Sequence, residues 1–160
     1  MDAGTFGDNV RGCSSKLYAA ALAITRSDAD AQDAVQEAIC RGWAKLDTLR
    51  KPEYFTTWLT RIAINSAINI VRKGKRSAPL LTDIPSSPSG TDERMDVRRA
   101  IESLDEQSRI CAVLYYFEDM SIAEVARATG TLEGTVKSRL HRARAKLREV
   151  LEGYGDDTAV

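Results

Sequence analysis

Apolar residues recur every three or four positions over most of the chain, and this spacing is typical of amphipathic α-helices. Alternating runs of β-branched residues, which would indicate strands, stand out nowhere. The pattern predicts helices over approximately residues 8–25, 29–46, 52–73, 92–103, 105–117, 122–129 and 132–151. The chain is therefore expected to be all-α.

A Pro- and Ser-rich segment separates the first three predicted helices from the others. Pro79, Pro85 and Pro88 lie in it among several serines, and this composition is typical of an extended linker. The expected organisation is a domain at 1–76, a linker at 77–92, a second domain at 93–152 and an acidic tail at 153–160. Each domain is small but long enough to form a helical core.

The second predicted helix has one apolar face and one acidic, amide-rich face. Ser27 or Asp28 is expected to cap it. The residues expected to face a core are Ala31, Ala34, Val35, Ala38, Ile39 and Gly42. The opposite side carries Asp30, Asp33, Gln36, Glu37 and Arg41. Such a face is either solvated or binds a partner, and the pattern leaves both open.

The third predicted helix begins at Pro52, which suits a first turn, and it has two unlike faces. Leu59, Ala63, Ile64, Ala67, Ile70 and Val71 are expected to pack. Opposite them lie Trp58, Arg61, Ile62, Asn65, Asn69 and Arg72. One interpretation makes Trp58 a core residue beside an ordinary surface. The favoured one is nucleic-acid binding, because proteins use aromatic, amide and cationic side chains together to hold unpaired bases.

The second half contains a helix-turn-helix pattern. Ser121 and Glu124 form a capping box, Gly130 supplies a left-handed stop, and Thr131 is expected to cap the following helix. The core stripe of that helix is expected to be Val136, Leu140, Ala143 and Leu147. Preceding helices are expected to contribute Ile101, Leu104, Ile110, Val113, Leu114 and Phe117. A basic amphipathic helix that binds RNA or a membrane surface, or has no partner, is the alternative.

Lysines and arginines are concentrated in two short stretches, although the formal net charge is zero. The chain has 23 basic and 23 acidic residues. Residues 61–76 hold five basic and no acidic residues, and residues 132–148 hold six against one. Because a local cluster of cations is enough to attract a polyanion, this distribution indicates two nucleic-acid surfaces.

Composition and motifs indicate neither a membrane protein, a metalloprotein nor an enzyme. No apolar run approaches the roughly 18 to 20 residues of a membrane span, and no secretion signal is present, so a cytoplasmic location is expected. Cys13, Cys40 and Cys111 lie far apart, without a His at ligand spacing, so neither a disulfide framework nor a metal site is expected. The single His141 lies among arginines. No catalytic residue and no cofactor are predicted.

Two segments resemble a known family. SIAEVARATGTLEGTVKSRLHRARAKL, residues 121–147, closely resembles the C-terminal helix-turn-helix of bacterial extracytoplasmic-function sigma factors, a group of the sigma-70 family. DADAQDAVQEAICRGW resembles the core-polymerase-binding helix of that family, and YFTTWLTRIAINSAINIVRKGKR resembles its promoter-melting helix. The resemblance covers residues 8–150, and it is specific because unlike motifs occur in the right order.

The resemblance implies a promoter-specificity subunit with two helical domains of the region 2 and region 4 types. Implied partners are core RNA polymerase, through its clamp helices and flap, promoter DNA, and an anti-sigma factor; the free chain is expected to be a monomer. The implied polymerase-binding residues are Asp33, Gln36 and Glu37. The implied minus-ten residues are Tyr54, Phe55, Trp58, Arg61, Asn65, Asn69, Arg72, Lys73 and Arg76. The implied minus-thirty-five residues are Thr131, Glu133, Thr135, Lys137, Ser138, Arg139 and Arg142.

The sequence also departs from the family pattern. Cys40 and Gly42 replace bulkier residues in the polymerase-binding helix, so that surface is expected to be slightly remodelled. Asn65 and Asn69 stand where many members carry other polar residues, which leaves the minus-ten sequence preference open. The alternative function is a stand-alone helix-turn-helix regulator, which would normally dimerise and bind an inverted repeat without polymerase.

Overall fold

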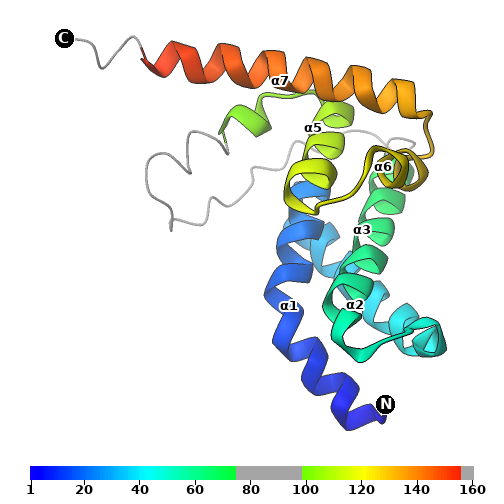
Figure 1. Ribbon diagram of the computed structural model, residues 1–160. Coiled ribbons are helices and arrows are strands. Elements are labelled where there is room, and N and C mark those ends of the chain that lie inside the picture. Colours follow the sequence, from blue (N-terminus) through cyan, green and yellow to red (C-terminus); the bar gives the residue numbers. More distant parts are fainter. Residues whose placement is uncertain (75–98, 156–160) are drawn as a thin grey trace. The chain divides into compact units, whose positions relative to one another are not determined.

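The computed structural model describes residues 1–74 and 99–155, and every regular element in these ranges is helical, as predicted (Figure 1). The chain divides into two compact units, Met1–Pro85 and Ser86–Val160. Their boundary falls within the predicted linker, 77–92, which lies outside the described residues. The start of the helix predicted at 92–103 and the end of the acidic tail also lie outside them.

The first unit is a bundle in which three helices pack against one another. These are α1 (Ala3–Thr25), α2 (Asp28–Ala44) and α3 (Phe55–Gly74). Two short 3₁₀ turns, η1 (Leu46–Thr48) and η2 (Pro52–Tyr54), connect α2 to α3. Pro52 occupies the first turn of η2, where its missing N–H costs no hydrogen bond.

Side-chain caps fix where the first two helices begin. Asp2 Oδ1 accepts a hydrogen bond from the Thr5 N–H at 2.8 Å, so α1 begins at Ala3 and the predicted start near residue 8 is wrong. Ser27 Oγ accepts from the Asp30 N–H at 3.3 Å, which identifies the cap of α2. Between the two helices Arg26 has a φ of 53°, the left-handed conformation that ends α1.

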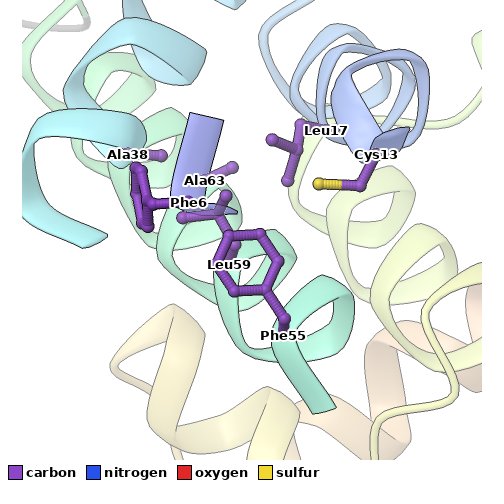
Figure 2. Close-up of a cluster of buried hydrophobic side chains, with 7 residues drawn as sticks. All are labelled: Phe6, Cys13, Leu17, Ala38, Phe55, Leu59 and Ala63. Atoms are coloured by element: carbon purple, nitrogen blue, oxygen red, sulfur yellow. The ribbon is translucent and has the colours of Figure 1, made fainter. Parts of the chain in front are cut away.

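The core of the first unit lies where α3 meets the other two helices. Figure 2 shows its central cluster: Phe6, Cys13, Leu17, Ala38, Phe55, Leu59 and Ala63. The predicted packing residues of α2 are all buried or partly buried. On α3 the buried surface is wider than predicted, because it also includes Thr60, Ser66 and Ile68. A helix flanked by two neighbours needs two adjoining contact faces rather than one stripe.

Gly42 permits the close approach of α2 to α3. A Cβ atom at this position would lie 2.6 Å from Leu59 Cδ1 and 3.5 Å from the ring of Trp58. Leu59 is fully buried, so its side chain has little space into which it can retreat. Gly42 is thus a buried contact between helices, in agreement with its predicted place facing the core.

The second unit contains the predicted helix-turn-helix. A helical turn at 99–102 precedes α5 (Glu106–Ala112), the π-helical turn η3 (Val113–Phe117), α6 (Ile122–Thr129) and α7 (Glu133–Gly155). The capping box is confirmed, since Ser121 accepts from the Glu124 N–H and Glu124 accepts from the Ser121 N–H. Gly130 has the predicted left-handed conformation, with φ of 66°.

The prediction that Phe117 is a core residue is wrong, because its side chain is 59% exposed. In a continuous α-helix Phe117 would share a face with Val113 and Leu114. Instead the Glu118 N–H donates to the Val113 carbonyl at 3.2 Å, a five-residue spacing that widens the turn. The wider turn rotates Phe117 away from the core, and Met120, at 7% exposed, is buried instead.

We predict that Gly42→Ala destabilises the first unit by about 1–3 kcal/mol, because the added methyl group overpacks a close helix contact. Urea unfolding followed by tryptophan fluorescence measures this unit alone, since both tryptophans, Trp43 and Trp58, belong to it. Gly12→Ala is the matched control: nothing lies within 4 Å of its added Cβ, so a gain of about 0.5–1 kcal/mol is expected. A Gly42→Ala variant as stable as the parent would contradict the close-packing interpretation.

Candidate functional site

The outer face of α2 carries the residues that the resemblance assigns to polymerase binding. Asp33 and Gln36 are exposed. The Glu37 carboxylate pairs with Arg41 one turn later on the same helix. This exposed pair contributes little to stability, about 0.5 kcal/mol, so a binding partner can displace it at small cost. Cys40 is exposed on the same helix, and the face is therefore accessible as a whole.

The outer face of α3 carries a continuous polar stripe. Arg61, Asn65, Asn69, Arg72 and Lys73 are all exposed, and the first four follow helical spacing along one side. Ile62, which the sequence places on this stripe, instead packs partly against the core cluster. The implied site residue Arg76 lies outside the described residues. The stripe joins cationic groups that can hold phosphates to amides that can both donate and accept hydrogen bonds.

The three aromatic residues assigned to DNA differ sharply in accessibility. Tyr54 is 57% exposed, whereas Phe55 is 4% exposed. The Phe55 ring packs edge-on against Phe6 of α1, with centroids 5.5 Å apart. The structure therefore makes Phe55 a core residue, and a contact with DNA would require its ring to leave the core. Adjacent residues at the start of a helix point in directions about 100° apart, so only one of the two can face the core squarely.

Trp58 is half-buried and held from two sides. Its Nε1–H donates to Thr48 Oγ1 at 3.2 Å, and its ring lies against Phe55, with centroids 5.8 Å apart. The Thr48 hydroxyl donates in turn to the Lys45 carbonyl at 2.7 Å. The ring is packed at the edge of the core, as the first interpretation expects, and it retains some exposed surface. Its role in nucleic-acid binding stays a prediction. No pattern in the sequence points to Thr48, because its position beside the Trp58 ring depends on the turn geometry of η1.

The face of α7 opposite its core stripe is polar and largely exposed. Val136, Leu140 and Ala143 are buried, and Leu147 is half-buried. Exposed on the other sides are Glu133, Lys137, Ser138 and Arg142, while Thr135 is half-exposed. Thr131 is half-exposed and shares a hydrogen bond of 3.0 Å with Thr129 Oγ1. No cap from Thr131 onto α7 is found in the described part of the chain, and the Leu132 carbonyl accepts the first helical bond.

Arg139 differs from its neighbours on α7 because it is half-buried. Its Nη1 atom is shielded from solvent and has no hydrogen-bond partner among the described residues. A base or phosphate contact would therefore require this side chain to move.

Phe6, like Thr48, is a residue that the sequence did not single out. Its spacing to Val10, Cys13 and Leu17 nevertheless follows the helical repeat of a core face.

The thiols provide no sign of a metal centre. Cys13 and Cys111 are buried, and burial raises the pKa of both thiols, which keeps them protonated at neutral pH. Within residues 1–74 and 99–155 no three His, Cys, Asp or Glu side chains cluster so that they could hold a metal ion. No helix in the same ranges is both long enough and apolar enough to cross a membrane.

Family models match both units of the chain. The model for sigma-70 region 2 matches residues 10–77, and that for sigma-70 region 4 matches residues 94–147. The RNA polymerase sigma factor SigV of Bacillus subtilis is 30% identical to this chain, with 82% of each protein covered. The ECF RNA polymerase sigma factor SigM of Mycobacterium tuberculosis is 33% identical, with 87% of this chain and 72% of its own length covered.

The chain belongs to the extracytoplasmic-function sigma factors. It is thus a promoter-specificity subunit of RNA polymerase, a transcription initiation factor. The probable RNA polymerase sigma factor RfaY of Xanthomonas campestris pv. campestris is 35% identical over 91% of this sigma factor, which spans only 40% of RfaY.

Solved structures share the fold of this chain. The sigma factor RpoE of Bartonella quintana, in complex with the anti-sigma factor NepR, matches with a TM-score of 0.66 at 26% identity, covering 92% of this chain and 97% of RpoE. CnrH, in complex with the cytosolic domain of CnrY, matches with a TM-score of 0.57 at 27% identity, covering 95% and 90%. The fold of this sigma factor is therefore that of its family.

The contrast between Tyr54 and Phe55 predicts unequal effects of their substitution on stability. Phe55→Ala should destabilise the first unit by about 3–5 kcal/mol, because it opens a cavity beside Phe6 and Leu59. Tyr54→Ala, one residue earlier, should change the free energy of unfolding by less than about 0.5 kcal/mol because the ring is exposed. Guanidinium titration with tryptophan fluorescence compares the two, and similar losses for both variants would show that Phe55 is not the buried ring.

Proposed function

We propose that the three exposed faces divide the work of transcription initiation among them. The outer face of α2 binds core polymerase, the stripe on α3 together with Tyr54 and Trp58 opens the minus-ten element, and α7 reads the minus-thirty-five element. The observation that carries the proposal is that the two cation-rich helices lie in the two segments matched by the region 2 and region 4 models. The site of action would be the cytoplasm, where the polymerase is.

Docking on polymerase is assigned to the acidic and amide groups of α2. Asp33 and Glu37 give this face a negative charge, and the complementary surface on the clamp would be basic. Apolar side chains that border this acidic face would supply most of the binding free energy. Trp43, 47% exposed at the end of α2 and packed edge-on against Phe6 at 5.2 Å, is placed to contribute.

Opening of the minus-ten element is assigned to α3 and the residues just before it. Unstacking a base costs a few kcal/mol, and stacking on an aromatic ring returns about 1–3 kcal/mol for each base. Tyr54 offers the most exposed ring for this purpose, and the remaining exposed surface of Trp58 lies one helical turn away. Arg61, Arg72 and Lys73 would hold the adjoining phosphates.

Recognition of the minus-thirty-five element is assigned to the first three turns of α7. Lys137 and Arg142 are exposed cations suited to phosphates or guanine, and Ser138 lies between them on the same side. Ser138 Oγ donates to the Gly134 carbonyl at 3.1 Å, which leaves its lone pairs free to accept from a base. Gly134, without a side chain, would let the backbone approach the groove closely.

Polymerase would make the two DNA contacts act together. Each unit of the free monomer presents a small basic surface, so the chain alone should bind duplex weakly. Holding the two units at a fixed separation, by the clamp and the flap, turns the second contact into an intramolecular one with a high effective concentration. The zero net charge suits this scheme, because it limits non-specific binding to DNA before assembly.

An anti-sigma factor is the proposed regulatory partner. RpoE was solved in complex with the anti-sigma factor NepR, and CnrH in complex with the cytosolic domain of CnrY; both folds match this chain at TM-scores above 0.5. An anti-sigma factor would cover the exposed face of α2 and the cation-rich faces.

This sigma factor, isolated from cells in which it is inactive, should elute from a sizing column as a heterodimer. Elution at the 17.6 kDa of the free chain would exclude a stable inhibitor.

The assignment of function is tested by transcription with purified components. Core polymerase supplemented with this chain should start transcripts at defined sites in a library of genomic promoter fragments. Polymerase alone, and the chain with DNA alone, should not, because neither has both binding surfaces in place. Absence of any site-specific transcript would contradict the proposal, whereas tight binding of a dimer to an inverted repeat would indicate a stand-alone regulator.

The affinity of the chain for purified core polymerase tests the proposed role of the outer face of α2. Asp33→Lys should weaken association with core polymerase by about tenfold or more, because it places a cation against the basic surface proposed for the clamp. Asp8→Lys makes the same change in net charge at an exposed position of α1 and should be near neutral. Equal losses in the two variants would indicate a general charge effect rather than a docking face.

A further inference from the structure

We propose that Arg139 positions the recognition helix against α5 and does not contact DNA. This inference rests on the proposed role of α7 at the minus-thirty-five element, and it changes what one of the arginines on that helix does. Three observations on the side chain lead to it: its angular position on α7, the shielding of its guanidinium, and the group on α5 that it meets.

The angular position places Arg139 beside the core rather than opposite it. At about 100° per residue, Val136, Leu140 and Ala143 define one buried direction of α7. Arg139 lies roughly 70° from the centre of that stripe, whereas Ser138 lies on the far side of the helix and Arg142 more than about 120° away. A side chain so close to the stripe reaches along the packed surface before it can reach solvent.

The Arg139 guanidinium is partly shielded from solvent, whereas a contact with DNA would require it to be exposed. Arg139 is half-buried, and its Nη1 atom is cut off from solvent without a hydrogen-bond partner among the described residues. A phosphate or a base edge could reach this nitrogen only after the side chain had moved. Lys137, Ser138 and Arg142, by contrast, are already exposed on the same turns.

The group that Arg139 meets is the buried thiol of Cys111 on α5. Cys111 is fully buried on a helix that packs against α7, and the Arg139 guanidinium acts on its thiol to lower the thiol pKa. Burial raises the pKa of the thiol more than the positive charge of Arg139 lowers it, so the sulfur stays neutral and is a weak acceptor. The contact therefore acts mainly by packing, with the stem of Arg139 filling space between the two helices.

An electrostatic interaction between the same two helices supports this arrangement. Asp105 caps α5 by accepting from the Ser108 N–H at 3.1 Å. Burial raises the pKa of the Asp105 carboxyl, but the hydrogen bonds from Ser108 and the positive charge of Arg142 lower it by more. The start of α5 is therefore within electrostatic reach of Arg142 on α7. Arg142 is exposed, whereas Arg139 is half-buried.

Substitution by methionine separates packing from charge. Arg139→Met keeps an unbranched side chain in the gap and removes the charge, whereas Arg139→Ala leaves a cavity over Cys111. Arg142→Met is the matched control, because it removes an exposed arginine from the same helix one turn later. If Arg139→Ala fails to fold, Arg139→Met still decides between the two roles.

The first measurement needs no DNA. In the full chain, alkylation of Cys111 by iodoacetamide is followed by mass spectrometry, with the exposed Cys40 as an internal reference. Arg139→Ala should speed the labelling of Cys111 by about tenfold, because local opening becomes easier, and Arg139→Met should leave it within about threefold of the parent. Unchanged labelling in Arg139→Ala would overturn the contact with α5, whatever the result of the transcription assay.

The second measurement uses holoenzyme and a promoter duplex recovered in the transcription experiment. Loss of a phosphate contact lowers the slope of log affinity against log salt by about one. Arg142→Met should show that change. Arg139→Met should keep both the slope and, within about threefold, the affinity, while Arg139→Ala should bind about five- to twentyfold more weakly with an unchanged slope. A slope lowered by about one in Arg139→Met, or parental affinity in Arg139→Ala, would overturn the proposal.

Discussion

The packing of α3 between α1 and α2 is the interaction on which the rest of the first unit depends. Leu59, Ala63 and Ile64 are almost completely buried there, so α3 cannot rotate without opening the core. Its polar stripe is therefore held at one angle to the bundle, and so is the outer face of α2. An exposed tyrosine and a half-buried tryptophan can act on DNA from this unit because the helices behind them are fixed.

Local signals in the sequence were enough to predict the fold and most of its boundaries. The capping box at Ser121 and Glu124 and the left-handed Gly130 depend on neighbouring residues only, and the structure has both. Helical periodicity likewise identified the core residues of α2 and the stripe of α7. The predicted polar stripe of α3, which holds Arg61, Asn65, Asn69 and Arg72, is exposed as that periodicity indicates. Their roles in binding remain predictions.

The errors arose where tertiary packing or an irregular turn decides the outcome. Phe117 follows the periodicity of a core residue, but the π turn at Val113 rotates it into solvent. Phe55 carries a family motif for DNA binding, yet it packs against Phe6, a residue nearly fifty positions earlier. Arg139 lies among exposed cations in sequence, yet its side chain is half-buried and its Nη1 atom is shielded from solvent. No pattern within a single helix contains this information.

The contact at Gly42 also limits how the sequence of this fold can evolve. The missing Cβ and the Leu59 side chain share one space, so neither position can be enlarged independently. A larger residue at 42 requires a smaller one at 59, and the two substitutions interact non-additively. Positions 42 and 59 should therefore vary together among related sequences, with the combined volume of their side chains held nearly constant.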